Sequence, residues 1–138
     1  MVPSTRIAAT LLMLLAATGA AGQDPAGAPL AQQRAAAEER FQRLIAEGRN
    51  AEAAAAGLEV VTLTGQLHGP DSIELASPLT NLATAQLQSG DLPGAEASYQ
   101  AAVALLEKRD GFLSPRLINP LVGLGEAYVR SEQYPLAT

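Results

Sequence analysis

Apolar residues recur at helical spacing along most of this chain. In residues 72–111, two amphipathic stretches are separated by Ser89-Gly90-Asp91, which predicts two helices joined by a tight turn. Apolar positions three and four residues apart give each helix one face that must pack against a neighbour. We therefore predict that this segment is a helical hairpin and that the rest of the chain is organised around it.

The flanking segments repeat the hairpin at an interval of 42 residues. Shifting residues 72–95 forward by 42 gives nine identities in 24 positions, where chance would give about two. They are Ser72/Ser114, Leu75/Leu117, Pro78/Pro120, Leu79/Leu121, Leu82/Leu124, Ala85/Ala127, Ser89/Ser131, Pro93/Pro135 and Ala95/Ala137. A backward shift aligns further pairs, including Gly48/Gly90 and Gly69/Gly111. The chain is therefore predicted to be a repeat array, and residues 30–138 hold about two and a half units.

The first repeat unit is predicted from its helix boundaries. Residues 23–29 form a linker because two prolines and a glycine interrupt any helix. A helix begins at Leu30 and ends at Gly48, and a second helix spans residues 51–66. Asp71 is placed to cap the next helix, with Glu74 completing a capping box.

The later boundaries leave two questions open. Pro78 lies within the next expected helix and recurs as Pro120, so it marks either a kink or the true start of that helix. Asp91 is expected to cap the following helix. A partner helix begins at Tyr134 and stops at Thr138 after a few residues. Either the natural chain continues or this end stays uncovered; we favour continuation because a repeat cannot bury its apolar face alone.

Residues 1–22 have the pattern of a secretory signal peptide. Arg6 is the only charge before the apolar run 7–17, which small residues follow. The run is shorter than the ~20 residues of a membrane span. We expect cleavage after Ala21 or Gly22, a periplasmic or secreted protein, and no stable membrane insertion after cleavage. The alternative is an uncleaved anchor.

The composition excludes several kinds of partner and catalytic site. A net charge of −5 and a pI near 4.8 argue against nucleic acid or an anionic membrane as the main partner. One histidine and no cysteine exclude zinc sites with several such ligands and a Cys-His nucleophile pair. No phosphate-binding glycine motif occurs. We predict no cofactor, no metal and no enzyme activity within these residues, and we interpret His68 as a loop residue.

Seven residues carry a family resemblance. Their spacing resembles the signature of the tetratricopeptide repeat; they are Leu79, Leu82, Ala83, Gly90, Ala95, Tyr99 and Ala102. The period of 42 residues is similar to the longer subtype of kinesin light chains and many bacterial repeat proteins. In the first unit, Phe41 stands where the family has a small residue. The resemblance implies an all-α fold, a right-handed α-solenoid of antiparallel helix pairs, whose first helices line a concave groove for a protein or peptide partner.

The resemblance also implies which side chains face that groove: Ser77, Thr80, Asn81, Thr84, Gln88, Asn119, Val122, Glu126 and Arg130. Asn81 matches a position that in similar proteins bonds the backbone of an extended peptide, but Gly123 follows at the next equivalent position. The central first helix has no Lys or Arg, which argues against a clamp for a terminal carboxylate. Two other roles stay open: a docking arm of a larger enzyme whose catalytic domain follows residue 138, and a spacer.

Overall fold

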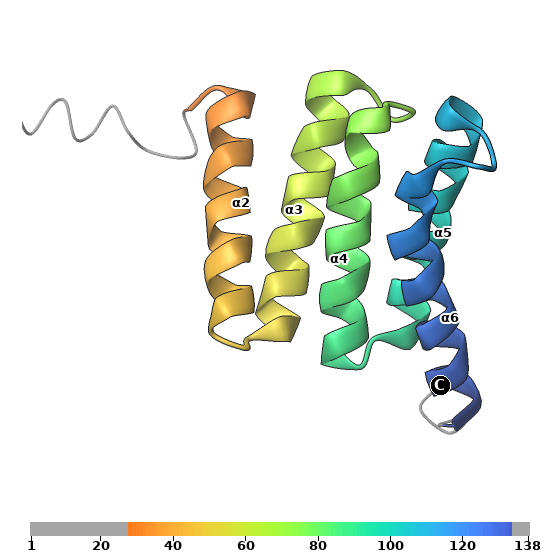
Figure 1. The fold of residues 1–138 in the computed structure, drawn as a ribbon. Helices are drawn as coiled ribbons and strands as arrows, with labels where there is room; N and C mark the ends of the chain where they lie inside the picture. Colours follow the sequence, from red (N-terminus) through yellow and green to blue (C-terminus); the bar gives the residue numbers. More distant parts are fainter. Residues whose placement is uncertain (1–27, 134–138) are drawn as a thin grey trace, which may run out of the picture.

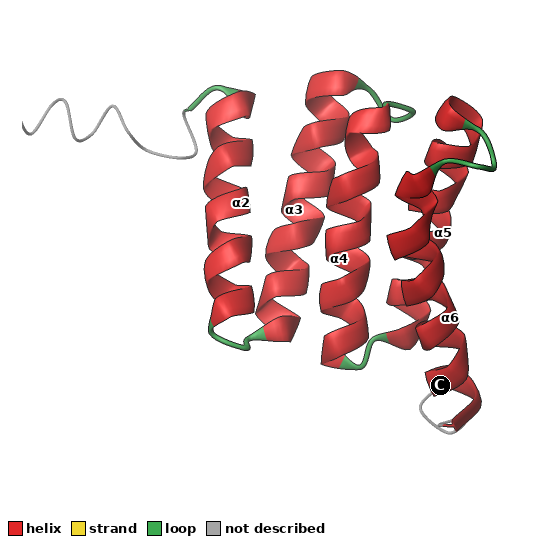
Figure 2. Cartoon of the chain, viewed as in Figure 1, coloured by secondary structure: helices red, strands yellow, loops and turns green. Residues whose placement is uncertain are grey.

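The structure is a computed structural model that describes residues 28–133 (Figure 1). In this range it contains five α-helices and two short 3-10 turns, and no strand (Figure 2). They are α2 (Leu30–Ala46), α3 (Asn50–His68), the turn η2 (Ile73–Leu75), α4 (Ala76–Ser89), α5 (Leu92–Asp110), the turn η3 (Pro115–Leu117) and α6 (Ile118–Gln133). The all-α prediction is confirmed. The expected signal peptide and the partner helix from Tyr134 lie outside the described residues.

Each helix packs on the next one along the chain. α2 contacts α3, α3 contacts α4, α4 contacts α5, and α5 contacts α6. Consecutive helices run in opposite directions and stand side by side (Figure 1). α4 also contacts α6, the first helix of the next pair. This stack of antiparallel pairs is the TPR-like helical repeat architecture that the sequence predicts.

The turns within the two pairs use the same residue. Gly48 follows α2 with φ of 71°, and Gly90, 42 residues later, follows α4 with φ of 87°. A side chain is disfavoured at such positive φ, so glycine ends both helices. The side chain of Asp91 then caps α5 by accepting a 3.1 Å hydrogen bond from the Gly94 N–H. The predictions for Gly48 and Asp91 are confirmed.

The predicted cap at Asp71 is wrong. The residue before the turn η2 is Ser72, whose hydroxyl oxygen accepts from the Glu74 N–H at 3.2 Å. Ser114 does the same for Arg116 at 3.3 Å. A 3-10 turn of three residues precedes both α4 and α6, and it brings the serine, not the preceding residue, within reach of the free N–H. Hydrophobic spacing does not reveal such a turn, so the sequence analysis placed the cap one residue too early.

The question about Pro78 is answered by where α4 begins. α4 starts at Ala76, so Pro78 is its third residue and lies in the first turn. Pro120 is likewise the third residue of α6. Both prolines therefore mark the start of a helix rather than a kink.

The core between paired helices depends on matched side-chain sizes. In the second pair, Ala83 of α4 and Ala95 of α5 are both fully buried in one cluster that includes Tyr99. In the first pair the large and small residues are exchanged between the two helices. The large residue, Phe41, stands on α2 in place of Ala83, and the small residue, Gly57, stands on α3 in place of Tyr99. A Cβ at Gly57 would lie 3.3 Å from two ring carbons of Phe41. The departure at Phe41 is therefore compensated within its own helix pair.

Candidate functional site: a polar groove along the first helices

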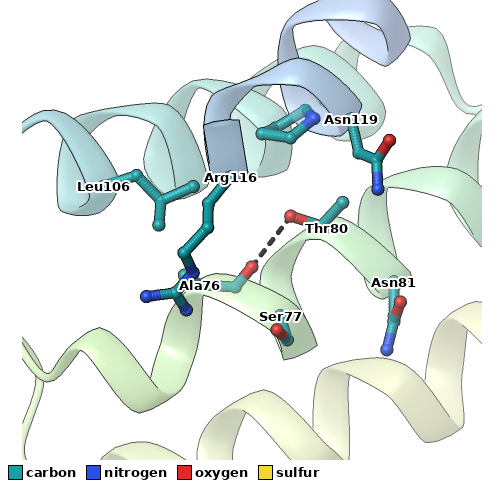
Figure 3. Close-up of a pocket in the computed structure, with 8 residues that line it drawn as sticks. Ala76, Ser77, Thr80, Asn81, Leu106, Arg116 and Asn119 are labelled. Atoms are coloured by element: carbon teal, nitrogen blue, oxygen red, sulfur yellow. Dashed lines mark hydrogen bonds between the residues drawn. The ribbon is translucent and has the colours of Figure 1, made fainter. Parts of the chain in front are cut away.

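Two hollows flank α4. The hollow between α4 and the start of α6 holds about 220 Å³ and is lined by Ala76, Ser77, Thr80, Asn81, Leu106, Arg116, Asn119 and Pro120 (Figure 3). The hollow between α2 and α4 holds about 460 Å³ and is lined by Arg34, Ala35, Glu38, Glu39, Ser77, Pro78 and Asn81. Because Ser77 and Asn81 line both, the two hollows form one surface, which we call the groove.

Two amide side chains line the hollow in Figure 3. Asn81 lies on the exposed surface of α4, and Asn119 lies on the exposed surface of α6. Within residues 28–133, neither side chain takes part in a hydrogen bond in the structure. Each amide therefore keeps two N–H donors and one carbonyl acceptor for a molecule in the groove.

The two threonines of the predicted set are used inside the protein. Thr80 lines the hollow, but its hydroxyl donates to the Ala76 carbonyl oxygen at 2.8 Å (Figure 3). The Thr84 hydroxyl donates to the Thr80 carbonyl oxygen at 2.9 Å and lies 2.9 Å from the Tyr99 hydroxyl. These bonds connect α4 to itself and to α5, so both threonines have structural roles.

The remaining predicted residues are not part of the hollows. Arg130 and Glu126 form an ion pair on α6 with 2.7 Å between Nη2 and Oε1. Arg130 also donates through Nη1 to the Leu87 carbonyl oxygen at 3.1 Å, close to the end of α4. Gln88 and Val122 are exposed but line neither hollow. The structure thus brings together Ser77, Thr80, Asn81 and Asn119, and leaves the others apart.

Arg116 is a groove residue that the sequence analysis missed. It lies in the turn η3, one helical turn before Asn119, and its half-exposed side chain is held by Asp110 at 3.2 Å. α4 itself has no Lys or Arg, as predicted, but the next unit supplies a cation at the edge of the hollow. The three-residue spacing of Arg116 and Asn119 could have revealed that both share one face.

Other site types find no support in the described part of the chain. Among residues 28–133, no group of three or more His, Asp or Glu side chains could hold a metal ion. His68 is exposed, but it is the last residue of α3, so its interpretation as a loop residue is wrong and the loop begins at Gly69. None of the helices in this range is both long and apolar enough to span a bilayer.

A comparison with protein-family models identifies one match. The tetratricopeptide repeat model matches residues 44–108, from the end of α2 to the end of α5. Searches of curated proteins and of solved structures each found no match. Tetratricopeptide repeats generally mediate protein–protein interactions and are typically non-catalytic scaffolds. Residues 44–108 are therefore similar to tetratricopeptide repeats, and the stacked helix pairs of the described residues agree with that similarity.

Proposed function

We propose that this chain is an exported scaffold that binds an extended segment of a partner protein in the groove. The observation that carries this proposal is the position of Ser77 and Asn81 in both hollows. A continuous polar surface across α2, α4 and α6 suits a chain that lies along several repeats. Side-chain amides and hydroxyls can pair with the backbone N–H and C=O groups of such a chain.

The charges around the groove favour recognition of a backbone over recognition of a charged group. The centre of the groove on α4 is neutral, because α4 has no ionisable side chain. Charged groups lie only at the two edges: Arg116 at one, and Arg34, Glu38 and Glu39 at the other. Tight interfaces are usually anchored by aromatic residues. The hollows hold none, so we expect modest affinity.

Export and the longer repeat subtype are part of the proposal. Arg6, the apolar run 7–17 and the small residues after it support a secretory signal peptide. The 42-residue period supports the kinesin-light-chain-like subtype. A scaffold of this kind would organise a complex in the periplasm or outside the cell.

The proposal can be tested with peptides selected from a displayed random library. Asn81→Ala and Asn119→Ala should each weaken binding about fivefold, as expected for one net hydrogen bond of ~1 kcal/mol. Gln88→Ala is the matched control because this exposed amide also lies on α4 but outside both hollows. Equal affinity of all three variants and the unaltered protein would show that the peptides bind elsewhere.

A further inference from the structure

The loop between α5 and η3 displays two large apolar side chains. Phe112 is 80% exposed and Leu113 is 96% exposed, the two highest values among the exposed large apolar residues of the described chain. Two adjacent apolar side chains at this position expose apolar surface to water and do not pack in the hydrophobic core. The stability of the fold therefore does not explain why Phe112 and Leu113 are present.

The first copy of this loop shows that the fold does not need them. Gly69 and Gly111 begin the two loops with φ of 96° and 82°. The Ser72 N–H donates to the Gly69 carbonyl oxygen at 3.4 Å, and the Ser114 N–H donates to that of Gly111 at 3.4 Å. The backbone is therefore the same in both copies.

The residues at the tip differ between the copies. Pro70 and Asp71 of the first loop stand where the second has Phe112 and Leu113. Pro70 and Asp71 stay exposed although α5 and α6 pack after them. If a further repeat stacked after α6, we would by analogy expect the tip of the second loop to stay exposed as well.

Basic residues flank the apolar tip along the chain. Lys108 and Arg109 are exposed at the end of α5, and Arg116 is half exposed in η3. Residues 108–116 hold these three cations and one anion, Asp110, in a chain with a net charge of −5. Cations at the end of a helix can serve the helix dipole. However, the equivalent positions at the end of α3 are Gln66 and Leu67, so the helix does not require them.

We propose that this loop is a lipid-docking tip that holds the protein at an anionic membrane surface. Phe112 and Leu113 enter the interfacial layer, while Lys108 and Arg109 lie among the anionic headgroups. The contact is peripheral and reversible, and it requires no spanning helix. The overall negative charge does not prevent it, because charges beyond about 10 Å are largely screened in physiological salt.

The contact is limited to this one tip. The α3–η2 loop lies at the same end of the stack in Figure 1 but carries exposed Asp71, and η2 after it carries exposed Glu74. These carboxylates are repelled by anionic lipids. Docking would therefore tilt the stack toward its α5–α6 end.

The chain has no tryptophan, so one substitution provides a specific reporter. In full-length protein, the Phe112→Trp variant should shift its emission to shorter wavelength on adding vesicles of equal parts phosphatidylglycerol and phosphatidylcholine. Vesicles of phosphatidylcholine alone should produce a smaller shift. Leu58→Trp is the matched control, because Leu58 is 57% exposed on α3 and belongs to no loop. Unchanged emission of the Phe112→Trp variant with both vesicle types would overturn the proposal.

Vesicle sedimentation gives an independent readout with two further variants. Phe112→Pro with Leu113→Asp installs the residues that the first loop already tolerates, and it should reduce binding at least tenfold with an unchanged circular dichroism spectrum. Lys108→Gln with Arg109→Gln should weaken binding about fivefold for each charge at low salt. Equal sedimentation of these variants and the unaltered protein would reject the tip as the lipid contact. The tip would also be rejected as the lipid contact if these variants lost binding to protein partners while their binding to vesicles was unchanged.

Discussion

The ring of Tyr99 occupies the space beside the backbone of Gly123. A Cβ at residue 123 would lie 2.5 Å from both Cε1 and the hydroxyl oxygen of Tyr99, and closer still to Cζ. Tyr99 belongs to α5 and Gly123 to α6, so the ring joins the second repeat to the third. This contact also explains why Asn81 has no counterpart: residue 123 takes its place in the repeat, and no side chain fits there.

Gly123→Ala should therefore destabilise the protein. Tyr99 is only 2% exposed and its hydroxyl lies at hydrogen-bonding distance from Thr84, so the ring cannot move aside easily. We expect a loss of ~1–3 kcal/mol in the free energy of unfolding, typical of overpacking. Chemical denaturation monitored by circular dichroism measures it.

Gly125→Ala, on the same helix, is the matched control. A Cβ at Gly125 meets no atom within 4 Å. The substitution should stabilise α6 by roughly 0.5–1 kcal/mol, because alanine favours a helix more than glycine does. If both variants behaved alike, the assignment of Tyr99 to this contact would be wrong.

The sequence predicted the architecture well because the information for it is periodic. The 42-residue identities, the glycines at Gly48 and Gly90, and Ala95 with its counterpart Ala53 all recur at fixed positions. Such features report contacts that every repeat must make. The turn after α4 and the small-residue contact at Ala95 could therefore be predicted from the period, and the cap at Asp91 from its residue type next to Gly90.

The candidate site was predicted less completely because its details break the period. Arg116 replaces Glu74, and Gly123 replaces Asn81, so neither can be inferred from the other repeat. The pattern shows that Thr84 and Arg130 lie on first helices, but not that they bond to Tyr99 and to the end of α4. A 3-10 turn before α4 moved the cap to Ser72, and hydrophobic spacing does not reveal such a turn.

Ala83→Leu or Ala95→Leu should disrupt the contact between α4 and α5. Both alanines are fully buried and belong to one cluster, so a longer side chain has no free space to enter. We expect ~1–3 kcal/mol of destabilisation from either substitution. Ala101→Leu provides the control because Ala101 is exposed on α5 and should have little effect. Thermal melts in which all three variants match the unaltered protein would contradict the packing of this helix pair.

Export can be tested by the mass of the mature protein. If the N-terminal segment is a signal peptide, expression in a secreting host should yield a chain that begins at Gly22 or Gln23. Arg6→Glu should slow processing, because it removes the only positive side chain before the apolar run. Mass spectrometry of the extracellular or periplasmic fraction distinguishes this result from an intact chain held in the membrane, which would favour the uncleaved anchor.

Arg130 should stabilise the boundary between the second and third repeats. Its Nη1 donates to the Leu87 carbonyl oxygen near the end of α4, which also accepts a 3.2 Å hydrogen bond from the Gly90 N–H. Arg130→Gln should cost ~1–2 kcal/mol, since the bond is charge-assisted and only partly exposed. Glu126→Gln removes the other half of the ion pair, but that carboxylate is 46% exposed, so less than about 1 kcal/mol should be lost. If urea denaturation gave equal losses for both variants, the ion pair, and not the bond to α4, would be the stabilising contact.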